Sequence, residues 1–124
     1  RSIAASYTGV NQNTTFTAGT ATSNSASSLS VSLTTTVLNS WLAGFCRNGT
    51  QASTAGANTT NRTTNNEDAF GDSNGGKSPV GAYTLAWTNT VTSDMSIVAC
   101  ILVPATKPTG GNPMFFSSGG LTLG

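Results

Sequence analysis

Hydrophobic and polar residues alternate strictly along two stretches of the chain. In residues 28–34, leucine or valine occupies every second position and serine or threonine the positions between them. Residues 83–88 repeat the pattern, with Tyr, Leu and Trp on one side and Thr or Ala on the other. Because successive side chains of a strand point to opposite faces, both stretches are predicted to be half-buried strands.

Two further stretches, residues 41–46 and 95–103, are hydrophobic at almost every position. Such runs are typical of strands covered on both faces. The Asn-Gly pair at 48–49 predicts a tight turn after the first run, while the polar residues 17–28 and 51–58 are predicted to be loops. Weaker patterns predict three more strands, at residues 3–8, 58–64 and 69–72.

No stretch repeats hydrophobic residues at the spacing of a helix, and strong helix formers such as Glu, Lys, Gln and Arg are scarce. About seven short strands separated by Gly-, Asn-, Ser- and Thr-rich turns predict an all-β fold, an antiparallel β-sandwich or jelly roll. We assign this domain to residues 1–106. Because the chain opens within a strand pattern, we expect that N-terminal strands of the sandwich are missing from it.

Residues 107–124 are predicted to form an extended tail rich in Gly, Pro and Phe. Such a tail cannot cover its own hydrophobic residues locally, so we expect it to dock onto a neighbouring subunit as an added strand. The alternative is that it folds back onto its own subunit. The residues predicted to make this assembly contact are Met114, Phe115, Phe116, Leu121 and Leu123.

Thr, Ser and Asn supply 50 of the 124 residues, whereas nine residues are charged and none is His. Charged residues make up about a quarter of an average domain, and His is the usual proton carrier near neutral pH. Ser and Thr are abundant, but they have no His base and no G-x-S-x-G motif, so the chain is predicted not to be an enzyme and to need no cofactor.

The low charge also limits the partners of the chain. A net charge of +1 with scattered basic residues argues against binding to nucleic acid. The longest hydrophobic run, residues 97–103, is far shorter than a membrane helix, so no membrane insertion is expected. A weakly charged surface does little to keep molecules apart, which favours a chain that works within an assembly.

The two cysteines, Cys46 and Cys100, both lie in the most hydrophobic stretches. They are compatible with one disulfide in an oxidising compartment or with two buried thiols. The only acidic cluster is Glu67, Asp68 and Asp72, followed by Asn74 in a Gly-rich turn. This cluster is interpreted as a solvated turn, although carboxylates and an Asn carbonyl could also bind calcium.

Aromatic residues and sequons complete the set of candidate sites. Trp41, Trp87 and Tyr83 lie on alternating strands and are expected in the core, with a sugar-stacking platform as the alternative. The glycosylation acceptor pattern N-x-S/T occurs at four predicted sites, Asn13, Asn48, Asn58 and Asn61.

Four short motifs occur together in a recognisable order: residues 4–10 (AASYTGV), 39–42 (NSWL), 72–75 (DSNG) and 97–105 (IVACILVPA). In these motifs the chain resembles the C-terminal half of a jelly-roll-like surface and virion protein family of bacteriophage and environmental bacteria. The resemblance covers residues 1–106 and carries over no catalytic residue. Compared with that family, the chain lacks the N-terminal strands, and its Phe-bearing tail is not part of the family pattern.

These observations together predict a non-enzymatic structural subunit of an exterior assembly, either a phage virion decoration or fibre protein or a subunit of a surface filament. Its expected location is extracellular or on a virion surface. Its expected partners are copies of itself or other subunits of the same assembly. The alternative is a carbohydrate-binding β-sandwich module, whose partner would be a glycan.

Overall fold

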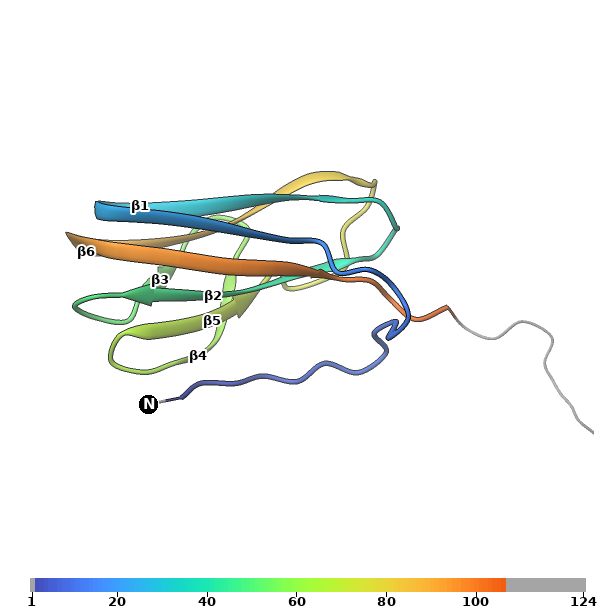
Figure 1. Cartoon of the computed structure of the whole chain (residues 1–124), viewed down its shortest axis with the longest axis horizontal. Helices are drawn as coiled ribbons and strands as arrows, with labels where there is room; N and C mark the ends of the chain where they lie inside the picture. Colours follow the sequence, from blue (N-terminus) through green and yellow to red (C-terminus); the bar gives the residue numbers. More distant parts are fainter. Residues whose placement is uncertain (1, 107–124) are drawn as a thin grey trace, which may run out of the picture.

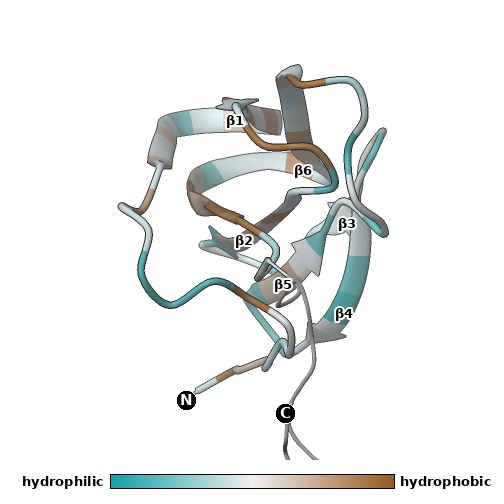
Figure 2. Cartoon of the chain, turned by 90° about the vertical axis from the view of Figure 1, so that its right-hand side faces the viewer, coloured by the Kyte–Doolittle hydropathy of each residue, from teal (hydrophilic) through white to brown (hydrophobic). Residues whose placement is uncertain are grey.

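A computed structural model of the chain describes residues 2–106. These residues form an all-β, antiparallel fold, as predicted, with six strands in one sheet where about seven strands were expected (Figure 1). The sheet curls around its own inner face, an arrangement consistent with a β-sandwich (Figure 2). Within residues 2–106 there is no helix that could cross a membrane. The strands are β1 (Ala18–Thr35), β2 (Trp41–Asn48), β3 (Thr54–Ala55), β4 (Thr60–Thr64), β5 (Asp68–Asp72) and β6 (Gly81–Leu102).

The sheet has the strand order β1-β6-β2-β5-β4, with β3 paired to β6 off this path. β1 and β6 pair along almost their whole lengths, from Ala18 opposite Cys100 to Thr35 opposite Gly81. The register shifts twice between residues 23 and 28 of β1: residues 89–92 of β6 lie opposite the single residue 27 of β1, and residues 24 and 25 of β1 lie opposite Asp94. This bulge joins the two strands predicted at 83–88 and 95–103 into one bent strand, because extra residues bend a strand without ending it.

Residues 18–28 are strand rather than the predicted loop. The prediction was wrong because it relied on hydrophobic alternation, and this half of β1 has almost none. Thr and Ser fit a pleated surface well when one face of the strand is in solvent. In this half of β1 only the exposure of the side chains alternates: the small residues Gly19, Ala21 and Ser23 are partly buried, and the residues between them are exposed.

The core lies inside the curl of the sheet and is built around Trp87, which is fully buried together with Leu42, Leu85 and Ile97. The Trp87 indole Nε1–H donates to Asn61 Oδ1 at 2.8 Å, so the one polar atom of the ring is satisfied. Gly71 of β5 lies against this ring. A Cβ at Gly71 would stand 2.8 Å from the Thr60 carbonyl oxygen and 3.2 Å from the indole, so this position has no room for a side chain.

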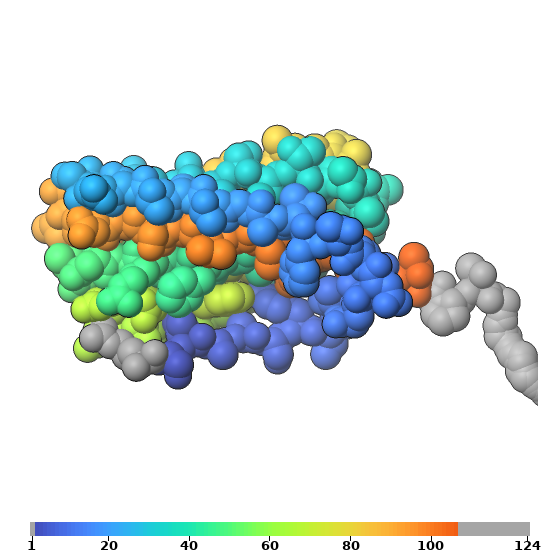
Figure 3. Space-filling model, viewed as in Figure 1, coloured from blue at the N-terminus to red at the C-terminus, as the bar shows by residue number. Residues whose placement is uncertain are grey.

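The N-terminal residues 2–17 form an extended segment rather than the strand predicted at 3–8. The segment runs alongside β4 and β5 (Figure 3). It is tied to β6 and the residues after it by three backbone bonds: Ile101 N donates to Thr17 O at 2.9 Å, Asn11 N to Val103 O at 2.8 Å and Ala105 N to Gly9 O at 2.8 Å. The segment covers part of the outer face of the sheet, which explains why residues 41–46 are hydrophobic on both faces.

Candidate functional site

The outer face of the sheet carries a buried carboxylate, Asp72, at the end of β5. It accepts two hydrogen bonds of 2.8 Å from the Arg62 guanidinium, which reaches it from β4. The Tyr7 hydroxyl donates a third at 2.6 Å, and the Asn74 backbone N–H a fourth at 2.8 Å. We call Tyr7, Arg62 and Asp72 the clasp, because they join the N-terminal segment to the sheet.

Within the clasp, the negative charge of Asp72 is balanced by Arg62 and its oxygens are hydrogen-bonded. Burial alone would raise the pKa of Asp72, but the hydrogen bonds from Arg62 and Tyr7 outweigh it and hold that pKa below its usual range. Burial and the bond to Asp72 raise the pKa of Tyr7, so its hydroxyl stays protonated near neutral pH. An ionised carboxylate whose oxygens are already bonded is suited to holding the segment in place.

Next to the clasp, a cleft of about 360 Å³ opens between the N-terminal segment and the start of β2. Its hydrophobic lining includes Trp41, which is half-buried, and Pro104. Tyr7 meets Trp41 edge-on, with ring centroids 6.2 Å apart and planes at 60°. Tyr7 also contacts Phe70 of β5, at 6.3 Å between centroids. These contacts and the clasp together fix the position of one wall of the cleft.

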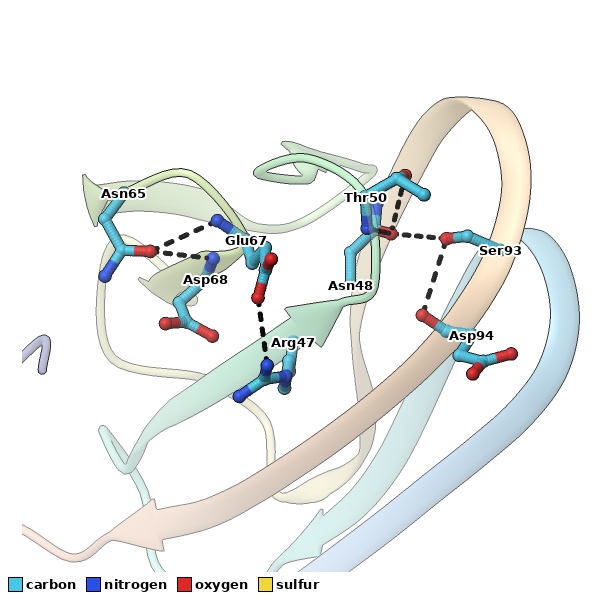
Figure 4. A network of polar contacts seen from close by, with 8 residues as sticks. All are labelled: Arg47, Asn48, Thr50, Asn65, Glu67, Asp68, Ser93 and Asp94. Atoms are coloured by element: carbon cyan, nitrogen blue, oxygen red, sulfur yellow. Dashed lines mark hydrogen bonds and ion pairs between the residues drawn. The ribbon is translucent and has the colours of Figure 1, made fainter. Parts of the chain in front are cut away.

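The predicted acidic cluster is not brought together. Asp68 and Asp72 lie at opposite ends of β5, and Glu67 pairs with Arg47 at 2.9 Å (Figure 4). Arg62 bonds both Asp72 and Asn74, and so takes the place that a cation would have between them. In residues 2–106, no three His, Cys, Asp or Glu side chains form a group that could hold a metal ion.

The chain bends at residues 49–51, directly after β2, but not through the tight turn that the Asn-Gly pair predicts, because neither Asn48 nor Gly49 has a positive φ. Asn48 is instead the last residue of β2 and is fully buried. Its side-chain oxygen accepts bonds from Thr50 N, Thr50 Oγ1 and Ser93 Oγ (Figure 4). The side chain thus caps the loop after β2 and ties it to β6.

Cys46 and Cys100 are both free thiols. Cys46 faces the core from β2, whereas Cys100 is on the outer face of β6, where it lies opposite Ala43. Burial raises the pKa of both thiols. Since the thiolate is the reactive form, raised pKa values make these cysteines poor nucleophiles.

The structure places the four predicted sequons in different settings. Asn13 and Asn58 are exposed. Asn48 is buried. Asn61 is half-buried, and its amide is already engaged, donating to Ser53 O at 2.9 Å and accepting from Trp87 Nε1. The predicted assembly residues Met114, Phe115, Phe116, Leu121 and Leu123 lie outside the described residues.

One feature that the sequence did not reveal is the edge of the sheet. Among residues 2–106, β1 forms its backbone ladder with β6 alone, so its other side has no strand partner. β1 is 18 residues long, and it contains no charged residue and no proline. Because residues 17–28 were predicted to be a loop, the sequence did not show how long this edge is.

Tyr7 and Arg62 were also not singled out from the sequence for their roles in the clasp. Arg62 is the single charged residue of β4, which was the one available signal that it has a specific partner. No family model matches the chain, and neither a curated protein nor a solved structure matches it.

Proposed function

We propose that the chain is a non-enzymatic structural subunit of an exterior assembly, a virion component or a surface filament, and that subunits join through the free edge of β1. The observation that supports this most is the length and chemistry of that edge. Strands of globular proteins are usually 3–10 residues long, whereas β1 has 18 residues and a single strand partner among the described residues.

An unpaired strand edge presents backbone N–H and C=O groups that can bind another strand. In an antiparallel pair, alternate residues direct these groups to either side, so about nine residues of β1 direct theirs away from β6. Each backbone hydrogen bond that forms contributes about 0.5–1.5 kcal/mol net. The edge therefore offers enough bonds for a stable and directional joint between subunits.

Proteins that remain monomeric protect such edges with Lys, Pro, short strands or bulges. β1 has one bulged region, between Ser23 and Ser28, and none of the other protections. On either side of the bulge lie two regular runs, residues 18–23 and 28–35. These runs are long enough to pair with a strand of a neighbouring copy.

Exposed hydrophobic side chains outside β1 also favour association with other subunits. Val98, on the outer face of β6, is 56% exposed, and Phe16, just before β1, is 72% exposed. Each exposed side chain of this kind gains about 1.5–3 kcal/mol when a partner buries it fully. Both residues lie close in sequence or register to the N-terminal half of β1.

The test compares assembly of two variants, one with two lysines added to the edge strand β1 and one with two lysines added to the neighbouring strand β6. Ser30→Lys with Thr34→Lys places two lysines on β1, and Ala82→Lys with Thr88→Lys places two on β6, all four at exposed positions of the same face. We expect light scattering to show assemblies for the wild type and the β6 variant, and monomers for the β1 variant. Equal assembly by both variants, or a monomeric wild type at high concentration, would contradict the proposal.

A further inference from the structure

We infer that the cleft beside Trp41 binds a neutral carbohydrate. The cleft is separate from the β1 edge, so this binding does not depend on the proposed assembly. Its volume of about 360 Å³ lies within the usual range for small-molecule sites, about 300–1,000 Å³. It opens on the outer face of the sheet, where a ligand reaches it without any displacement of the core.

The cleft has the two kinds of surface that a sugar ring requires. A pyranose has one face of C–H groups and a rim of hydroxyls, so it is bound by an aromatic ring with hydrogen-bonding groups beside it. Trp41 supplies the aromatic ring, and Leu102 and Pro104 extend the hydrophobic surface. Ser6, Thr8 and Asn39 supply the hydrogen-bonding groups.

These polar groups are available for a ligand. The side chains of Ser6, Thr8 and Asn39 make no hydrogen bond to any other residue in the described range 2–106. Asn39 is exposed and is held by its backbone instead, which has φ = 63° and donates from N–H to Lys77 O at 2.9 Å. Its amide is therefore free both to donate to and to accept from a sugar hydroxyl, on a backbone that is held in place.

The charge of the cleft selects among ligands. Among the described residues 2–106, none that lines the cleft is charged, and the carboxylate and guanidinium of the nearby ion pair, Asp72 and Arg62, already bond each other. A phosphate, sulfate or carboxylate would leave its charge without a counter-charge, which is costly at a partly enclosed site. A neutral sugar carries no such cost, which is why we infer this class.

The clasp makes the cleft ready for binding before the ligand arrives. Tyr7 is anchored at Asp72, and its neighbours Ser6 and Thr8 are thereby held at the cleft wall. A wall that is already ordered spares the ligand the entropy of ordering it. Tyr7→Phe, which removes the anchoring hydroxyl, should weaken sugar binding although the hydroxyl itself belongs to the clasp.

The experiment titrates the full chain with neutral hexasaccharides of glucose, xylose and N-acetylglucosamine, and follows binding by calorimetry. We expect saturable binding of at least one of them, and a loss of about tenfold or more in affinity in Trp41→Leu. Acrylamide quenching of Trp87, the remaining tryptophan, reports whether this variant is folded. Sialylated or phosphorylated oligosaccharides should bind more weakly than their neutral counterparts.

A second variant keeps the test decisive if Trp41→Leu does not fold. Asn39→Gly removes the amide, and glycine accepts the positive φ of this position without strain. The matched control is Asn58→Gly, since Asn58 is also exposed with φ = 62° but lies between β3 and β4. We expect weaker binding in Asn39→Gly alone. Absence of saturable binding to every sugar, or affinities unchanged in Asn39→Gly and Trp41→Leu, would overturn the inference.

Discussion

The hydrogen bond from Tyr7 to Asp72 gives a direct measure of how firmly the N-terminal segment is attached. Tyr7→Phe removes this bond and leaves the ring contacts with Trp41 and Phe70 in place. A hydrogen bond to a charged group contributes about 1.5–3 kcal/mol. Tyr7 is only half-buried and Asp72 keeps its bonds to Arg62, so we expect the lower end, about 1.5 kcal/mol.

That loss should be visible in thermal unfolding. For a domain of this size, 1 kcal/mol corresponds to about 4 °C in Tm, so Tyr7→Phe should unfold about 6 °C below the wild type by circular dichroism. The matched control is Tyr83→Phe, because the Tyr83 hydroxyl also donates at 2.6 Å, but to the exposed carbonyl of Pro79. A bond to an exposed neutral acceptor is easily replaced by water, so we expect a loss below about 0.5 kcal/mol there.

The comparison of the two variants can refute this reasoning. If Tyr7→Phe is no more destabilising than Tyr83→Phe, the buried carboxylate does not hold the segment, and the clasp has no structural role. If Tyr7→Phe lowers Tm by much more than about 10 °C, the segment is part of the cooperative core and the bond strength alone does not describe its attachment.

Three further predictions concern pH, packing and the thiols. The pKa of Tyr7 is raised in the folded state, so ionisation of this hydroxyl costs stability as the pH rises. The stability difference between the wild type and Tyr7→Phe, measured by urea unfolding at each pH, should stay constant from about pH 6 to 9 and shrink above about pH 10. A difference that grows above pH 10 would contradict this prediction. Gly71→Ala should destabilise the chain by about 1–3 kcal/mol in urea unfolding, whereas Gly49→Ala, whose Cβ would meet only contacts of 3.7 Å or more, should change it by less than about 0.5 kcal/mol. Cys46 and Cys100 should both react with a thiol reagent in denaturant without prior reduction, and far more slowly in the native chain; no reaction in denaturant would mean that they are oxidised.

Periodic hydrophobic patterns predicted the strands that bury one face. Residues 28–34 and 83–88 both lie in strands. Trp87 is in the core as expected, but Trp41, expected there too, is half-buried at the outer cleft, and Tyr83 is only partly buried. Residues 17–28 were missed because an edge strand of Ser, Thr and Ala has no hydrophobic alternation to detect. The bulge at 89–92 was hidden for the same reason, since three of its four residues are polar, as in a turn.

The site was less predictable because its residues are far apart in the sequence. Tyr7 alternates with its neighbours as a strand residue would, but its partner Asp72 is 65 residues away. Asp72 and Asn74 were read as an acidic turn because Arg62, which neutralises them, belongs to another strand. Side-chain pairing across strands depends on register, and a pattern within one strand does not contain it.

Hydrogen exchange of the β1 backbone amides tests most directly whether β1 offers its free edge to another subunit. Amides of β1 that point away from β6 should exchange fast at low protein concentration and become protected as concentration rises and assemblies form. Amides that point toward β6 should be protected at every concentration. If the chain assembles while the outward amides of β1 still exchange fast, the subunits join through another surface and the account is wrong.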